Sequence, residues 1–127
     1  MIKRKAAALA VLVAASAPAI AQSGWAQVGQ AVAQASASAA TVSSPVLDPR
    51  YREGMICVDG HLIRLNQAII HYEGGTQQTI QLRARVANGG CSRGFGLNSR
   101  HTIQSVEVTY DPATLEGASA HVQLYAR

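Results

Sequence analysis

Hydrophobic and polar residues alternate along the second half of the chain with the two-residue period of a β-strand. Three runs show this pattern most clearly, at residues 76–86, 106–110 and 119–127. The apolar positions of the first run are Ile80, Leu82, Ala84 and Val86, and those of the last are Ala120, Val122, Leu124 and Ala126. Such alternation predicts strands with one buried and one solvated face. Ile103 is out of phase with the middle run, which predicts a β-bulge or a strand with apolar contacts on both faces.

Glycine, asparagine and proline separate these runs at intervals of about 8–12 residues, a spacing typical of all-β sandwiches and barrels. The pair Gly74-Gly75 can supply the positive φ of a tight hairpin turn. No amphipathic helix is evident after Gly54. We therefore predict one all-β domain over residues 55–127, an antiparallel, jelly-roll-like sandwich of about seven strands. A small closed β-barrel is the alternative.

Residues 22–54 carry a weaker pattern and are interpreted as a lead-in rich in alanine, serine and glutamine. A first strand could begin near Trp25. Residues 33–44 have small side chains and little to bury, which favours a loop or a mobile segment. One large ring near a terminus usually fixes that end to a core. We expect this of Trp25, rather than an exposed ligand platform.

Residues 1–21 have the layout of a secretory signal peptide. A basic head, Lys3-Arg4-Lys5, precedes a short apolar stretch and a small-residue cleavage site, Ala19-Ile20-Ala21. The apolar stretch is shorter than the about 20 residues that span a bilayer. We expect a mature protein that begins near Gln22, has no membrane span and is periplasmic or secreted.

Removal of this segment changes the charge balance. The formal net charge of the full chain is +4, and the loss of three basic residues lowers it to +1. A nearly neutral, exported chain lacks the basic surface of a nucleic-acid-binding protein, so we expect no nucleic-acid partner.

Cys57 and Cys91 are the only cysteines in the sequence. In an oxidising compartment, two cysteines of one small domain usually pair. A disulfide is the favoured hypothesis. Two buried thiols, or a cysteine–histidine nucleophile, are the alternatives.

Several short motifs resemble a family of small exported bacterial proteins of unknown function that includes the enterobacterial protein YaaI. They are Gly24-Trp25 with Val28-Gly29, Ile63-Arg64-Leu65, Gly89-Gly90-Cys91-Ser92-Arg93, Arg100 near Ile103, Val106 to Tyr110, Ala120-His121-Val122 and the terminal Ala126-Arg127. The resemblance implies export and an all-β fold. It implies no activity.

Candidate binding residues are arginines. Arg83 and Arg85 share the polar face of the strand predicted over residues 76–86, where an arginine row could dock carboxylates or sugar acids or simply keep the sheet soluble. The glycine-rich segment 89–96 holds Arg93 and could form an anion-binding nest, although a strained hairpin explains the glycines equally well. Arg100 lies near enough in sequence to join a pocket with Arg83 and Arg93.

Catalytic and metal chemistry find little support in the sequence. The histidines are spaced without a compact ligand motif, so we expect no metal and no other cofactor. They are His61, His71, His101 and His121. Nothing pairs two carboxylates across a cleft as glycosidases require, and no nucleophile elbow is present. We expect no enzyme activity.

Two functional hypotheses remain. The first is a non-catalytic module of the cell envelope that contacts a protein or a polysaccharide. The second is a jelly-roll domain that binds a small anion or a carbohydrate. Aromatic residues are few, and we expect only Tyr125 to point outward, which weakens the case for stacking on sugar rings.

Overall fold

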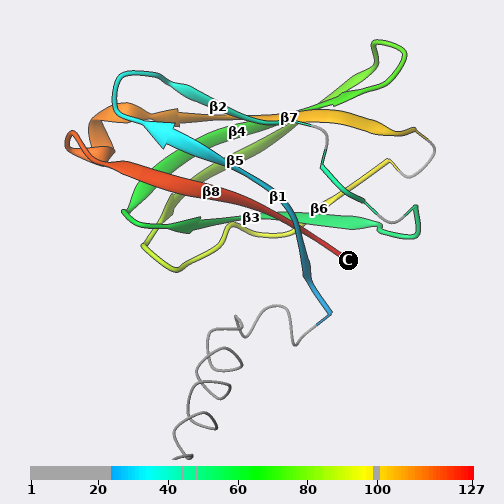
Figure 1. Cartoon of the computed structure of the whole chain (residues 1–127), viewed down its shortest axis with the longest axis horizontal. Coiled ribbons are helices and arrows are strands. Elements are labelled where there is room, and N and C mark those ends of the chain that lie inside the picture. The colour runs from blue at the N-terminus through cyan, green and yellow to red at the C-terminus, as the bar shows by residue number, and fades with distance from the viewer. Residues whose placement is uncertain (1–23, 44, 48, 99–100) are drawn as a thin grey trace, which may run out of the picture.

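The computed structural model describes residues 24–127 except 44, 48, 99 and 100, and the predicted signal peptide lies outside the described residues. Figure 1 shows two stacked layers of strands. The elements are β1 (Ala26–Gln34), β2 (Ala39–Ser43), β3 (Glu53–Asp59), β4 (Ile63–Tyr72), β5 (Gln77–Val86), β6 (Phe95–Gly96), β7 (Ile103–Asp111), the 3₁₀ turn η1 (Pro112–Leu115) and β8 (Ser119–Ala126).

Each layer is a four-stranded antiparallel sheet. Sheet A has the strand order β1-β8-β3-β6, and sheet B has the order β2-β7-β4-β5. The prediction of an all-β sandwich is confirmed, and the barrel alternative is wrong because the strands form two separate sheets. Among the described residues, no helix has the length and apolar character needed to cross a membrane.

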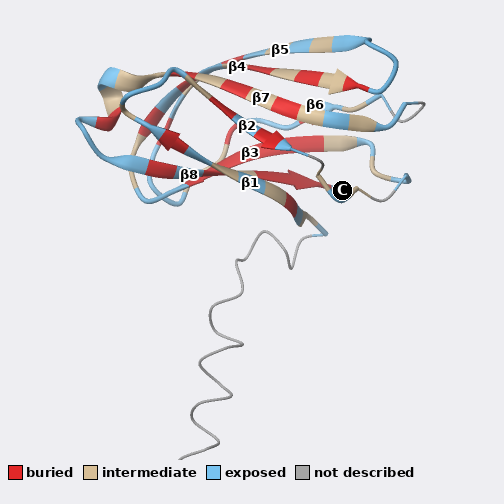
Figure 2. Cartoon of the chain, turned by 45° about the horizontal axis from the view of Figure 1, so that its top comes forward, coloured by how far each residue is buried: buried red, intermediate tan, exposed pale blue. Residues whose placement is uncertain are grey.

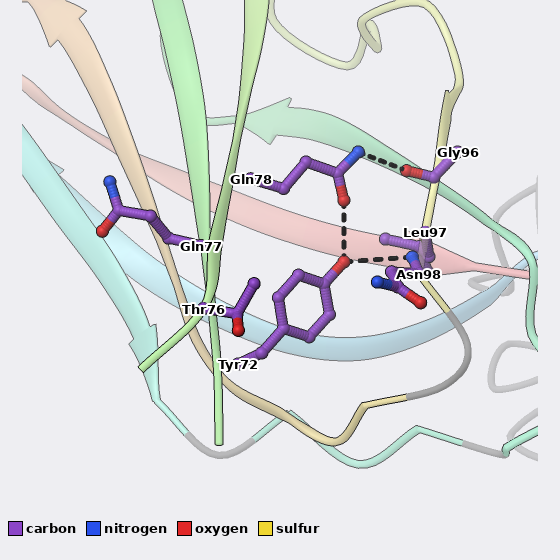
Figure 3. A pocket seen from close by; sticks show the side chains of 7 residues that line it. All are labelled: Tyr72, Thr76, Gln77, Gln78, Gly96, Leu97 and Asn98. Atoms are coloured by element: carbon purple, nitrogen blue, oxygen red, sulfur yellow. Dashed lines mark hydrogen bonds between the residues drawn. The ribbon is translucent and has the colours of Figure 1, made fainter. Parts of the chain in front are cut away.

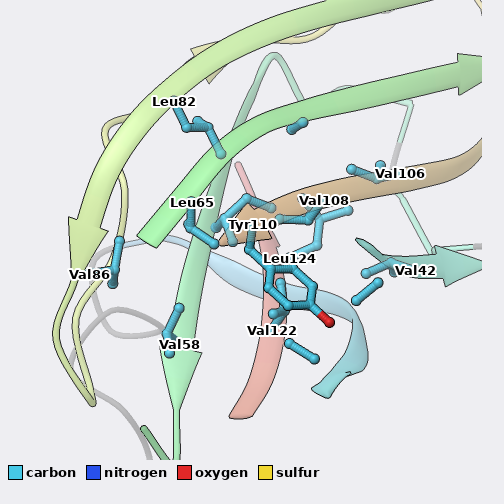
Figure 4. Packing of buried hydrophobic residues seen from close by; sticks show 14 of the residues in the cluster. Val42, Val58, Leu65, Leu82, Val86, Val106, Val108, Tyr110, Val122 and Leu124 are labelled. Carbon is cyan, nitrogen blue, oxygen red and sulfur yellow. The ribbon is translucent and has the colours of Figure 1, made fainter. Parts of the chain in front are cut away.

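The core lies between the two sheets and consists of the alternate side chains that the sequence pattern singles out. On β5, Leu82 and Val86 are buried while Arg83 and Arg85 are exposed. On β8, all four predicted apolar positions are buried. Figure 4 shows side chains from both sheets meeting in this space, and Figure 2 shows buried residues along the strands and exposed residues mainly in the turns between them. Apolar burial of this kind is the main stabilising contribution to the fold.

The predicted loop over residues 33–44 is wrong at both ends. Its first two residues end β1 (Ala26–Gln34) in sheet A, and Ala39–Ser43 forms β2 at the edge of sheet B. Ala40 and Val42 are buried in the core. A Cβ placed on Gly29 of β1 would lie only 2.5 Å from Cγ1 of Val42, so the two sheets approach closely at this side of the sandwich. The absence of a side chain at Gly29 therefore permits Val42 to pack against β1.

Two irregularities interrupt the central strands. The β4–β7 register shifts where Tyr72 pairs with Ile103, which confirms a bulge at the out-of-phase residue. The β4–β5 register shifts between Leu65 and Gln67, where β5 has one residue more than β4. Arg83 lies within this second bulge with a φ of +45°, a left-handed conformation that is uncommon for residues other than glycine.

A disulfide joins Cys57 on β3 to Cys91 in the segment that follows β5, as the sequence predicted. Disulfides persist in oxidising compartments, so the bridge indicates an extracytoplasmic location. It belongs to a second apolar cluster, on the outer face of sheet A, with Met55, Tyr125 and Trp25.

Trp25 thus anchors the start of the described chain, although to this outer cluster and not to the main core. Tyr125 does lie on the side of sheet A away from the core, but its side chain is buried there by the same cluster. The expected outward orientation of Tyr125 is therefore confirmed, but the buried ring offers no exposed aromatic surface.

Candidate functional site

Three arginines lie on the outer, solvent-facing side of sheet B. Arg83 and Arg85 project from β5, and Arg64 of β4 lies directly opposite Arg85 in the register of the two strands. All three are exposed, and none of their guanidinium groups makes a hydrogen bond or ion pair with a described residue. We call Arg64, Arg83 and Arg85 the arginine cluster.

Sequence reasoning missed Arg64 as a site residue. Its place on a polar strand face is visible in the sequence, but its juxtaposition with Arg85 depends on the register across a hairpin that contains a bulge. A one-residue change in register would move each of these side chains to the other face of the sheet.

Asp111 is the acidic neighbour of the arginine cluster. It pairs with Arg64 in the register of β7 and β4. Its Oδ1 accepts a hydrogen bond of 3.1 Å from the backbone N–H of Ala113, which caps η1. One carboxylate oxygen is therefore engaged by the turn, and no ion pair forms between Asp111 and Arg64.

Arg93 has a different role from Arg83 and Arg85. Its Nη2 donates a hydrogen bond of 2.7 Å to the carbonyl oxygen of Gln81, which holds the segment after β5 against that strand. Arg93 thus lies near the arginine cluster but is engaged by the backbone. Arg100, the fourth predicted arginine, lies outside the described residues.

The glycine-rich segment 89–96 is bound to sheet A. The N–H groups of Gly89 and Ser92 donate to β3 carbonyls, and that of Gly90 donates to Ala87. The buried Ser92 hydroxyl accepts a hydrogen bond from the N–H of Ile56 and donates one to the carbonyl of Arg93. Because these donors already have partners, the geometry supports the hairpin interpretation of the glycines over an anion nest.

A hollow of about 340 Å³ adjoins the arginine cluster at one end of the sandwich. Arg85 lines one side of it, and His61 and Glu116 line another, with 3.7 Å between His61 Nε2 and Glu116 Oε1. Thr114, also in its wall, donates to the carbonyl of Asp111 and accepts from the N–H of Arg64. The hollow therefore has a cationic side and an acidic side.

A second hollow of about 380 Å³ lies where β5 approaches the segment around β6 (Figure 3). The Tyr72 hydroxyl donates to Gln78 Oε1 and accepts from the N–H of Asn98, and the Gln78 amide donates to the carbonyl of Gly96. These bonds join sheet B to β6 and to the segment that follows it. The groups shown in Figure 3 thus connect the two sheets on this side of the sandwich.

The histidines lie apart from one another. His61 faces Glu116, His71 of β4 faces Glu107 of β7 at 3.6 Å, and the ring of His101 lies 6.0 Å from that of Tyr72. His121 is exposed on sheet A, opposite Asp59 in register. Within the part of the chain that the structure describes, no three metal-ligating side chains come together.

Fold and site together define a small antiparallel β-sandwich with an unpaired arginine cluster on one outer face. The chain belongs to the DUF2541 family, a domain of unknown function, which matches residues 6–126. This confirms the predicted membership of a family of unknown function; the particular kinship with YaaI stays a prediction. Among curated proteins, none matches the sequence.

One solved structure, described as the structural and functional characterization of Pseudomonas aeruginosa AlgX, resembles this fold. The TM-score is 0.53 at 15% sequence identity, over 80% of this chain. The chain spans only 26% of the length of that protein. At this identity the likeness concerns the fold alone.

Proposed function

We propose that this chain is a non-catalytic module, exported by a cleaved signal peptide to the periplasm or beyond, that holds a polysaccharide of the cell envelope against the outer face of sheet B. The observation that carries the proposal is the composition of that face. Its strand register aligns four cross-strand rows of mainly polar side chains. They are Ser43–Ser105–His71–Gln77, Thr41–Glu107–Ile69–Thr79, Ala39–Thr109–Gln67–Gln81 and Asp111–Arg64–Arg85.

This surface suits a hydroxyl-rich polymer better than a protein. Stable protein interfaces have an apolar centre enriched in aromatic residues, whereas Tyr72 and Tyr110, the tyrosines of this sheet, are buried in the core. The outer face instead presents hydroxyls and amides. A polysaccharide bound here would be held by hydrogen bonds and charge, without stacking of sugar rings on aromatic side chains.

The carboxylates favour a binding role over a catalytic one. General acid–base hydrolysis of a glycan needs two carboxylates that flank one bond. In this fold, Glu53 pairs with Arg127, Glu107 with His71 and Glu116 with His61. Asp111 caps η1. Each of these acids thus has a partner of its own.

The test is co-sedimentation of the purified mature protein with isolated, insoluble envelope polysaccharide. Thr79→Glu, at an exposed position of sheet B, should reduce the bound fraction. The matched control is Gln30→Glu, at an exposed strand position of sheet A, which should leave the bound fraction unchanged.

Equal loss in both variants, or no retention of the wild type, would overturn the proposed function. Retention that disappears when the envelope fraction is treated with protease would identify a protein partner and would also overturn it.

A further inference from the structure

The arginine cluster places like charges where a sheet does not favour them. Directly opposite residues of an antiparallel pair have Cβ atoms about 5 Å apart, and like charges there are destabilising. Arg64 and Arg85 occupy such a pair. No described carboxylate forms an ion pair with either of them.

Arg83 adds a second unfavourable feature on the same face. Its φ of +45° would suit glycine better than an L-residue with a side chain. Backbone strain of this kind often marks functional sites, where surrounding structure enforces it. Charge repulsion and strain thus coincide at three neighbouring residues.

Protection of an exposed sheet edge explains only part of this arrangement. β5 is an edge strand, and bulges and charges on such strands prevent pairing with other chains. That explanation accounts for Arg83 and Arg85. It does not account for Arg64, because β4 is an interior strand between β7 and β5. Moreover, Arg93 already covers the β5 edge at the carbonyl of Gln81.

We propose that Arg64, Arg83 and Arg85 bind carboxylate groups, so that the polysaccharide recognised by sheet B is an acidic one with uronic acid units. This inference rests on the proposed function and names the chemical class of its ligand. Guanidinium groups bind carboxylates through paired, charge-assisted hydrogen bonds. Arg64 lies on β4, and Arg83 and Arg85 lie at two positions along β5. Because the three arginines are spread over the sheet, they suit a polymer that carries one carboxylate on each of several units.

The experiment measures binding of polygalacturonate to the mature protein by isothermal titration calorimetry at low salt. Arg64→Gln and Arg85→Gln should each weaken binding at least about fivefold, a loss that corresponds to about 1 kcal/mol. Arg52→Gln is the charge-matched control, because it also removes one exposed positive charge. Arg52 precedes the start of β3, whereas Arg64 lies after the other end of that strand. It should change the affinity less than about twofold. Added salt should weaken binding of the wild type, since the arginines are exposed.

Arg83→Gly separates binding from folding. It should raise the melting temperature by relief of the positive φ, while it weakens polygalacturonate binding. A variant that is more stable yet binds less well cannot be explained by misfolding. Unchanged binding in this variant would exclude Arg83 from the cluster.

Two further polymers separate this inference from the proposed function. Neutral dextran should not bind; binding as tight as that of polygalacturonate would contradict a carboxylate site. Poly-glutamate should bind more weakly than polygalacturonate. If it binds equally well, with the same losses of affinity in the variants, the arginine cluster binds carboxylates but the proposed polysaccharide ligand is wrong. Equal affinity of wild type, Arg64→Gln and Arg85→Gln for polygalacturonate would overturn the inference itself.

Discussion

The arginines on the two outer faces of the sandwich differ in whether their guanidinium groups have partners. On sheet A, the Arg127 guanidinium lies 4.4 Å above the Trp25 ring, and its Nε donates to Glu53 Oε1 at 2.8 Å. The Arg127 carbonyl also accepts hydrogen bonds from the N–H groups of Arg52 and Glu53. On sheet B, Arg64 and Arg85 face each other with no such partners among the described residues.

This contrast separates structural charge from charge available for binding. Arg127 and the apolar cluster on the outer face of sheet A hold the two ends of the described chain together. The Cys57–Cys91 disulfide adds a covalent connection within that cluster. The guanidinium groups of the arginine cluster make no comparable contacts with other described residues. We therefore expect changes on the outer face of sheet A to alter the free energy of unfolding, and changes in the arginine cluster to alter binding.

Loss of the disulfide should have the largest effect. The bridge closes a loop with a sequence separation of 34 residues, which corresponds to about 3–4 kcal/mol in the chain-entropy description. Replacement of both cysteines by alanine should lower the free energy of unfolding by that amount in urea titrations. Reduction of the wild type should reproduce the loss, and a decrease below about 1 kcal/mol would show that the bridge contributes little.

Trp25→Ala should have the next largest effect. The ring packs on Met55, Cys57 and Tyr125 and lies under Arg127, so its removal loses apolar burial and a cation–π contact worth about 2 kcal/mol together. Thermal unfolding followed by near-ultraviolet circular dichroism can measure this. Trp25→Phe should retain part of the stability, whereas equal stability of all three proteins would mean that Trp25 does not anchor the chain.

Arg83→Gly should change stability in the opposite direction. Relief of the left-handed conformation should contribute about 1–2 kcal/mol, and the added freedom of the unfolded chain should remove about 0.4–1 kcal/mol of it. The free energy of unfolding should therefore rise by about 0.5–1 kcal/mol. Arg85→Gly is the matched control on the same strand, since Arg85 has no positive φ and should lose stability. A loss of stability in both variants would show that Arg83 is not strained.

Arg64→Gln should have the smallest effect on folding. Removal of one of two facing charges should alter the free energy of unfolding by no more than about 0.5 kcal/mol, with any change favourable because repulsion decreases. Chemical denaturation of the single variants and of the variant with both Arg64 and Arg85 replaced would detect it. A marked loss would assign Arg64 a structural role and remove the contrast between the faces.

The sequence predicts the strands whose apolar positions alternate, because one face of each is buried against the opposite sheet. It does not predict β2, because the alanines, valine and serine of this strand form only a weak alternating pattern. The strand forms in the structure, where Val42 packs closely against Gly29 of the opposite sheet. At the site, Arg83 and Arg85 follow from the alternation of β5. Arg64 depends on cross-strand register, and the engagement of Arg93 by the Gln81 carbonyl depends on the path of a loop.

The most direct test of the account is a titration of ¹⁵N-labelled mature protein with short oligogalacturonates, followed by amide chemical shifts. We expect the shift changes to concentrate on β4 and β5 around Arg64, Arg83 and Arg85, and to disappear in the variant with Arg64 and Arg85 both replaced by glutamine. The amides around Trp25 and Tyr125 on sheet A should not change. Shifts centred on that face, or no shifts at saturating ligand, would contradict the assignment of binding to sheet B.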